Sequence, residues 1–155
     1  MPYILGVDPG TTSLGWAIID SSTLELITSG CFFLRYRREL QGNDALLASE
    51  MWRFWVETIL KQPARPNCIV VEQNAMNRLY SNVEMCILSY AVGSGMDVAA
   101  VHPMTWKSIL GIKPTGKHKQ NKLASLEYVR ELGYNVPTDH QADAICLALC
   151  GCQSQ

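Results

Sequence analysis

Residues 3–20, YILGVDPGTTSLGWAIID, contain two apolar runs separated by a short polar turn. Tyr3–Asp8 and Leu14–Asp20 are each long enough for a strand, so we expect them to form a β-hairpin. The first run ends in Asp8, which is followed by a turn rich in small residues. In α/β sheets, ligands collect at the carboxyl ends of buried strands. The hairpin therefore predicts both the start of a sheet and a first site residue.

The remainder of the chain predicts one α/β domain that spans residues 1–155. Alternation over residues 24–33 indicates a third antiparallel strand with a bulge at Gly30, and the short apolar runs 67–72 and 97–101 indicate further strands of the sheet. Helical spacing of apolar residues marks four helices and one helical turn: 44–61, 79–92, 119–132, 139–150 and 106–110. These elements predict an α/β fold, a mixed five-stranded sheet with helices on both faces.

The composition excludes several classes of protein. With 155 residues, of which 48% are apolar and 17% charged, the chain can fill one core and is too apolar for intrinsic disorder. Its start lacks a basic segment ahead of an apolar run, and no charge-free apolar stretch is long enough to span a membrane. We therefore expect an intracellular protein without a membrane segment, whose six cysteines are reduced thiols.

The net charge is −1, but the positive charge is concentrated in two patches. Arg35, Arg37 and Arg38 form one of them. Five of the six lysines form the other, within residues 98–126, which hold no Asp or Glu: Lys107, Lys113, Lys117, Lys119 and Lys122. Such patches are either solvated surface or binding sites for a polyanion, and the spacing alone leaves both interpretations open.

Further acids repeat the pattern of Asp8. Glu72 directly follows an apolar strand, and His140 and Asp143, at i and i+3, share one face at the start of the last helix. Asp139 and Asp143, at i and i+4, could form that face instead. A single acid at such a place is usually a cap or a surface charge, but three at the ends of apolar elements indicate one site. Hard oxygen ligands favour Mg²⁺ or Mn²⁺, and two such cations suit phosphodiester hydrolysis.

These segments resemble the RuvC-like Holliday junction resolvases of the ribonuclease H and retroviral integrase superfamily. The matching segments follow the family order over nearly the whole chain: 6–18, 70–73, 117–129 and 137–149. The resemblance implies a ribonuclease H-like fold, a homodimer, and two divalent cations, Mg²⁺ or Mn²⁺, per active site. It further implies paired nicks across a four-way DNA junction, and hence a compartment that contains DNA.

The resemblance also implies the roles of individual residues. Asp8, Glu72 and Asp143 match the family's catalytic, metal-binding acids. His140 stands where many members carry another aspartate, so it is expected to be either a neutral metal ligand or a residue that assists the attacking water. The predicted catalytic and metal-binding set is therefore Asp8, Glu72, His140 and Asp143.

A DNA-binding surface follows from the same resemblance. Lys122 and Lys107 resemble family lysines near the scissile phosphate. Many bacterial members carry an aromatic wedge three residues after the glutamate, where this chain has Ala75. Either Met76, Tyr80 or another residue therefore acts as the wedge, or the strands are opened differently. The other residues expected to contact DNA are Lys113, Lys117, Lys119, Arg35, Arg37, Arg38, Arg78 and Tyr80.

Paired nicks need two active sites, and each chain supplies one, so a two-fold dimer would match the symmetry of the junction. We expect the helix over residues 79–92 to form the dimer interface, through Met85, Ile87, Leu88 and Tyr90. The alternative role of this helix is to pack against the sheet.

Other functions fit parts of the sequence. Residues 6–13, GVDPGTTS, also look like the first phosphate loop of the actin and sugar-kinase ATPases, but those proteins need two lobes and a second glycine-rich loop. A structure-selective nuclease of broader specificity, acting on forks, flaps or RNA-containing substrates, would carry the same acids. A non-enzymatic binder of branched DNA would not need them.

Overall fold

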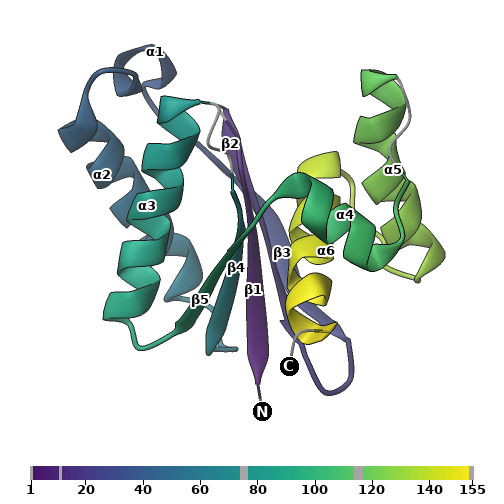
Figure 1. The fold of residues 1–155 in the computed structure, drawn as a ribbon. Coiled ribbons are helices and arrows are strands. Elements are labelled where there is room, and N and C mark those ends of the chain that lie inside the picture. Colours follow the sequence, from purple (N-terminus) through teal and green to yellow (C-terminus); the bar gives the residue numbers. More distant parts are fainter. Residues whose placement is uncertain (1, 11, 74–76, 114–116, 154–155) are drawn as a thin grey trace.

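The structure, a computed structural model, describes residues 2–10, 12–73, 77–113 and 117–153, without the side chains of residues 118, 119, 121 and 122. Its strands form one five-stranded sheet in the order β3-β2-β1-β4-β5 (Figure 1). The strands are β1 (Tyr3–Pro9), β2 (Ser13–Asp20), β3 (Leu26–Phe33), β4 (Cys68–Glu72) and β5 (Asp97–Val101). The first three are antiparallel, and β4 and β5 extend the sheet parallel to β1. The predicted mixed sheet is confirmed.

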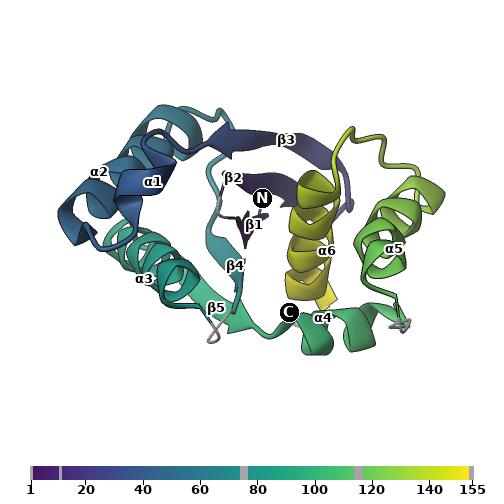
Figure 2. The ribbon, with the colours of Figure 1, turned by 90° about the horizontal axis from the view of Figure 1, so that it is seen from above.

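Helices cover both faces of this sheet, also as predicted. Figure 2 shows α1, α2 and α3 on one side of the sheet and α4, α5 and α6 on the other. The helices are α1 (Arg37–Leu40), α2 (Asp44–Phe54), α3 (Arg78–Gly93), α4 (Pro103–Leu110), α5 (His118–Glu131) and α6 (Asp139–Gln153). A π-helical turn, η1 (Trp55–Ile59), continues α2. None of the helices in the described ranges is both long and apolar enough to cross a membrane.

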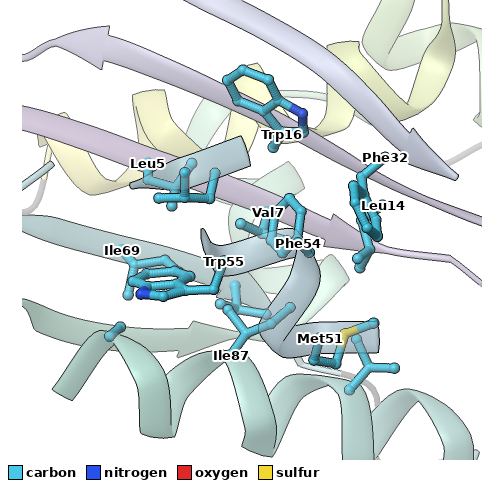
Figure 3. Packing of buried hydrophobic residues seen from close by; sticks show 14 of the residues in the cluster. Leu5, Val7, Leu14, Trp16, Phe32, Met51, Phe54, Trp55, Ile69 and Ile87 are labelled. Atoms are coloured by element: carbon cyan, nitrogen blue, oxygen red, sulfur yellow. The ribbon is translucent and has the colours of Figure 1, made fainter. Parts of the chain in front are cut away.

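The sheet separates two hydrophobic cores, because successive strand residues point to opposite faces. Leu5 and Ile69 pack into the first core, under α2 and α3, where Phe54 and Trp55 are fully buried (Figure 3). Val70, the neighbour of Ile69, packs into the second core, under α4, α5 and α6. Burial on both faces explains why β1 and β4 are continuous apolar runs.

The third strand differs from the prediction in one detail. Gly30 pairs directly with Trp16, and the register shifts further along, where Ile18 and Ile19 of β2 face Thr28 and Leu26, so that Ile27 is the extra residue of β3. The predicted bulge at Gly30 is therefore wrong. A Cβ at Gly30 would lie 3.0 Å from the indole ring of Trp16, so the glycine leaves room for a large cross-strand side chain.

Helix α6 packs directly on β1 and β2 because two strand positions lack a Cβ. A Cβ at Gly6 would overlap the carbonyl oxygen of Ala144, and a Cβ at Gly15 would overlap that of His140. This close approach brings the first turn of α6 beside the end of β1. The sequence predicts a site residue, Asp8, at this end of the strand.

Helix α3 contradicts part of the predicted dimer interface. Ile87 is fully buried in the first core, so it cannot contact a second chain without unfolding of this helix. Tyr90 is half-buried and its hydroxyl donates a hydrogen bond to the carbonyl of Ala48 at 2.9 Å. Leu88 also packs against this core, whereas Met85 is 61% exposed.

Candidate active site

Three elements bring the predicted catalytic residues to one edge of the sheet. Asp8 lies near the end of β1, and Glu72 is the last residue of β4, its parallel neighbour. His140 and Asp143 lie in the first turns of α6. His140 Nδ1 is 3.1 Å from Oδ2 of Asp8. His140 of the predicted i, i+3 pair therefore faces the end of β1.

Burial and mutual repulsion favour the protonated forms of the three acids. Burial, followed by the negative charge of Asp8, raises the pKa of Glu72 to about 7. Burial and the charge of Asp8 also raise the pKa of Asp143 well above its ordinary value. For Asp8 itself, burial raises the pKa more than the hydrogen bond with His140 lowers it. Such a cluster binds either protons or cations.

The hydrogen bond with Asp8 changes the properties of His140. This bond, opposed by partial burial, raises the pKa of the imidazole above 6.5. A carboxylate bonded to Nδ1 also fixes the orientation of the ring. Nε2 is then the nitrogen available to a proton or a cation.

Two residues beside the acids were not found from the sequence. Trp106 is fully buried in α4, and its Nε1 donates a hydrogen bond to Oε2 of Glu72 at 3.0 Å. Ser125 is 2% exposed in α5, and its hydroxyl faces Asp143 and lowers the pKa of that carboxyl. This hydroxyl has no hydrogen bond of standard geometry among the described residues. A buried tryptophan signals that its N–H needs a partner, but no sequence spacing identifies that partner.

The donor set fits a hard divalent cation. Within the described residues, no three acidic, histidine or cysteine side chains converge closely enough to enclose a metal ion. Carboxylates that repel one another are expected to stand apart until a cation neutralises them. The buried carboxyl of Asp8, the half-buried carboxyls of Glu72 and Asp143, one imidazole and the hydroxyl of Ser125 offer the oxygen-rich surroundings that Mg²⁺ and Mn²⁺ prefer.

The predicted DNA-binding residues differ in how exposed their side chains are. Lys107 is half-buried and lies in α4, and its charge lowers the pKa values of Glu72 and Asp143. The exposed ones are Arg35, Arg37, Arg38, Arg78, Lys113 and Lys117, and Tyr80 is half-buried. Lys119 and Lys122 lie in α5, but their side chains are not among those that the structure describes. Ala75 and Met76 also lie outside the described residues.

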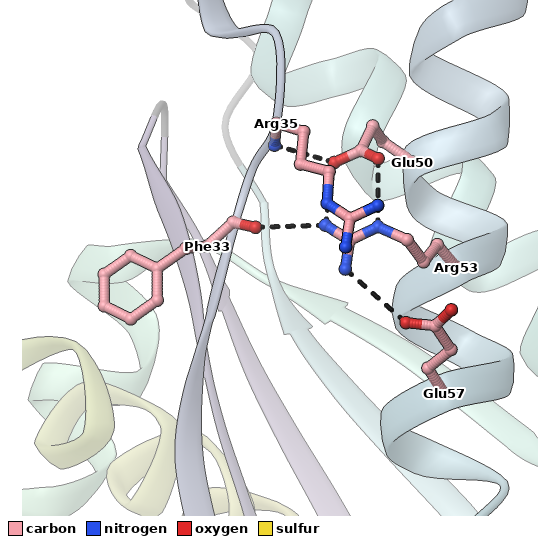
Figure 4. A network of polar contacts seen from close by, with 5 residues as sticks. All are labelled: Phe33, Arg35, Glu50, Arg53 and Glu57. Carbon is pink, nitrogen blue, oxygen red and sulfur yellow. Dashed lines mark hydrogen bonds and ion pairs between the residues drawn. The ribbon is translucent and has the colours of Figure 1, made fainter.

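A polar network anchors the arginine patch to α2 (Figure 4). Glu50 is buried and accepts hydrogen bonds from the backbone N–H of Arg35, at 2.8 Å, and from the guanidinium of Arg53. Arg53 also donates to the carbonyl of Phe33 and pairs with Glu57 at 3.6 Å. Burial by itself would raise the pKa of Glu50, but these donors lower it. The network therefore holds the backbone at Phe33 and Arg35, from which the arginine patch starts, against α2.

Comparisons of the sequence and of the fold with known proteins both find nucleases that act on DNA junctions. No family model matches the sequence. The crossover junction endodeoxyribonuclease RuvC of Rickettsia prowazekii is 27% identical over 158 residues, which cover 94% of this chain and 93% of that protein. The structure of T. thermophilus RuvC in complex with Holliday junction substrate has a TM-score of 0.64 at 18% identity, covering 97% of this chain and 92% of that one. The Holliday junction resolvase of fowlpox virus has a TM-score of 0.64 at 16% identity and covers 99% of both chains.

The sheet order, the helices on both faces and these likenesses define a ribonuclease H-like fold. Within that class the chain is RuvC-like in both sequence and fold. The resemblance and the fold class predicted from the sequence are confirmed.

Proposed function

We propose that this protein is a metal-dependent endonuclease that resolves four-way DNA junctions by paired hydrolysis of phosphodiester bonds. The observation that carries the proposal is the meeting of Asp8, Glu72, His140 and Asp143 at one edge of a RuvC-like sheet. The likeness to a crossover junction endodeoxyribonuclease over 94% of this chain supports the same reaction. A DNA substrate implies a compartment that contains DNA.

Asp8, Glu72, His140 and Asp143 are the residues that would hold the metal, two Mg²⁺ or Mn²⁺ ions per site. When bound, such ions supply activation of a water molecule and stabilisation of the leaving oxygen. Asp8 orients the imidazole through Nδ1, so that Nε2 of His140 is able to bind a cation or accept a proton. The cation of Lys107, close to the acids, offers charge to the scissile phosphate.

The two basic patches are proposed to bind the arms of the junction. Helix α1, which carries Arg37 and Arg38, and helix α5, which carries Lys119 and Lys122, lie on opposite sides of the sheet (Figures 1 and 2). DNA laid across the edge that holds the acids would meet both patches. Lysine and arginine in exposed segments contact phosphates, so they contribute affinity without sequence preference.

A homodimer is part of the proposal, because two opposed nicks need two sites. Helix α3 supports an interface through the residues that it leaves exposed. Met85 and Val92 are 61% and 59% exposed, and Trp52, on the adjacent α2, is 52% exposed and stacks edge-on against Tyr90. Large apolar side chains in an exposed group mark contact surfaces between proteins.

The decisive experiment compares labelled four-way junction, Y-fork and linear duplex, each incubated with the protein with and without Mg²⁺. We expect paired, symmetric nicks in the four-way junction, and only when Mg²⁺ is present. Equal cleavage of the fork would instead indicate a structure-selective nuclease of broader specificity. Binding without cleavage under all conditions would refute the enzymatic proposal.

A further inference from the structure

Trp106 contacts two functional groups of the candidate active site. Its indole is fully buried, and Nε1 donates a hydrogen bond to Oε2 of Glu72 at 3.0 Å. The ammonium of Lys107 lies over the same indole, 5.3 Å from the ring centre, which is within the range of a cation–π interaction. One side chain therefore holds a carboxylate at its edge and a cation at its face.

The backbone explains how the indole reaches Glu72. β4 and β5 are parallel and in register, with Glu72 opposite Val101. Directly after β5, His102 caps helix α4, because its Nδ1 accepts a hydrogen bond from the backbone N–H of Met104 at 3.1 Å. The helix thus starts next to the carboxyl end of β4. Trp106, in its first turns, is brought against the last residue of that strand.

An indole is well suited to position a metal-binding carboxylate. Its N–H only donates, so it stabilises the charged carboxylate and fixes one oxygen. It carries no charge, and therefore does not compete with a cation as a lysine would. The other oxygen of Glu72 is left for the metal. Partners of this kind orient metal ligands in many proteins.

We propose that Trp106 is a positioning residue that fixes the Glu72 carboxylate for metal binding and holds Lys107 beside it. The inference rests on the proposed function, in which Glu72 is a metal ligand. In this arrangement, metal affinity depends on a neutral aromatic side chain in α4, which contributes no ligand atom of its own.

The chain offers a matched control. Trp55 is also fully buried, and its Nε1 donates to the hydroxyl of Ser94 at 3.2 Å, in the core on the other face of the sheet. Trp106→Phe and Trp55→Phe each remove one indole hydrogen bond and shrink one buried ring. In calorimetric titration of the DNA-free protein with Mn²⁺, we expect Trp106→Phe to weaken binding by about tenfold or more. Trp55→Phe should bind as the unaltered protein does.

The outcomes separate this inference from the proposed function. Unchanged Mn²⁺ affinity in Trp106→Phe, or an equal loss in Trp55→Phe, would overturn the positioning role, even if the unaltered protein cleaves four-way junctions. Absence of junction cleavage by the unaltered protein would overturn the proposed function, whereas the Mn²⁺ titrations would still decide the role of Trp106. An unaltered protein that binds no Mn²⁺ would overturn the inference.

A second measurement needs no variant and applies if Trp106→Phe does not fold. The chain has four tryptophans, whose indole N–H resonances can be assigned and followed by ¹H–¹⁵N correlation spectroscopy. Addition of Mg²⁺ should shift the resonance of Trp106 and leave that of Trp55 in place. An unmoved Trp106 resonance in protein that binds Mg²⁺ would overturn the inference.

Discussion

His140 is the residue at which this site differs most from a set of four carboxylates. It bonds to Asp8 and lies one turn before Asp143. We predict that His140→Ala abolishes or greatly slows junction cleavage while junction binding in gel-shift assays is unchanged. His140→Asp should retain cleavage, because it supplies an anionic ligand at the same i, i+3 spacing from Asp143.

The adjacent Asp139 is the control for His140. It lies in the first turn of α6, where the positive end of the helix dipole stabilises a negative charge. Asp139→Asn should cost at most about 1 kcal/mol of stability and little cleavage. An inactive Asp139→Asn together with an active His140→Ala would show that the i, i+4 pair holds the metal.

The raised pKa of Glu72 predicts how the metal-free protein responds to pH. An acid whose pKa rises on folding, here from 4.5 to about 7, stabilises the fold below its unfolded pKa. That contribution, on the order of 3 kcal/mol, is lost as the pH rises through about 7. Asp8, Asp143 and His140 shift in the same direction. The melting temperature in EDTA should therefore fall between mildly acidic and mildly alkaline pH.

Two comparisons test the origin of this effect. Glu72→Gln should flatten the dependence of melting temperature on pH in EDTA, since the amide does not titrate. Mg²⁺ should stabilise the unaltered protein more at alkaline pH, where the acids are ionised. If the variant and the unaltered protein lose stability in parallel, the ionisation of Glu72 is not the cause.

At the scale of secondary-structure elements, the contact between β2 and α6 determines where His140 lies. A Cβ at Gly15 would lie 2.9 Å from the Cβ of His140 and would overlap its carbonyl group. We predict that Gly15→Ala costs about 1–3 kcal/mol in urea unfolding, because the helix start must move. Cleavage should fall further than stability alone explains, since His140 is displaced from Asp8.

Gly93 provides the matched control for that substitution. It ends α3, and a Cβ there would meet nothing within 4 Å. Gly93→Ala should leave both unfolding and cleavage nearly unchanged. Full cleavage by folded Gly15→Ala would show that α6 tolerates displacement and that its position is not critical.

At the scale of the whole molecule, the lysine-rich segment tests the proposed path of DNA. Replacing Lys117 and Lys119 together by alanine should reduce the slope of junction affinity against salt concentration by about two at most. Removal of Lys61 and Arg65, which precede the amino end of β4 at the opposite edge of the sheet, is the control. An unchanged slope in the first variant would mean that DNA passes elsewhere.

The exposed face of α3 tests the proposed dimer. Met85→Glu should convert a dimer into monomers in analytical ultracentrifugation, because a charge would be buried in the interface. Monomers should make single nicks in place of paired ones. Leu132→Glu is the control, since Leu132 is 53% exposed after α5, on the other side of the sheet. An unaltered protein that is monomeric and still makes paired nicks would refute the dimer.

The sequence by itself determined the five strands, every helix except the short α1, and the candidate acids of the site. Apolar runs of strand length, bounded by proline and glycine, predict β1, β2 and β4 from local patterns alone. An acid at the end of such a run, as at Asp8 and Glu72, is local information too, and the parallel pairing of β1 with β4 then brings the two together. The family resemblance then assigned these acids to a common active site, because the matching segments follow one another in the family order.

Only the tertiary structure decided the contacts between distant segments. Trp106 and Glu72 are 34 residues apart, and His140 and Asp8 are 132 residues apart. The burial of Ile87, which corrects the predicted interface, and the space that Gly30 leaves for Trp16 depend on packing in the same way. Local periodicity shows which face of an element is apolar. Which partner meets that face, and at what distance, follows from close packing of the whole chain.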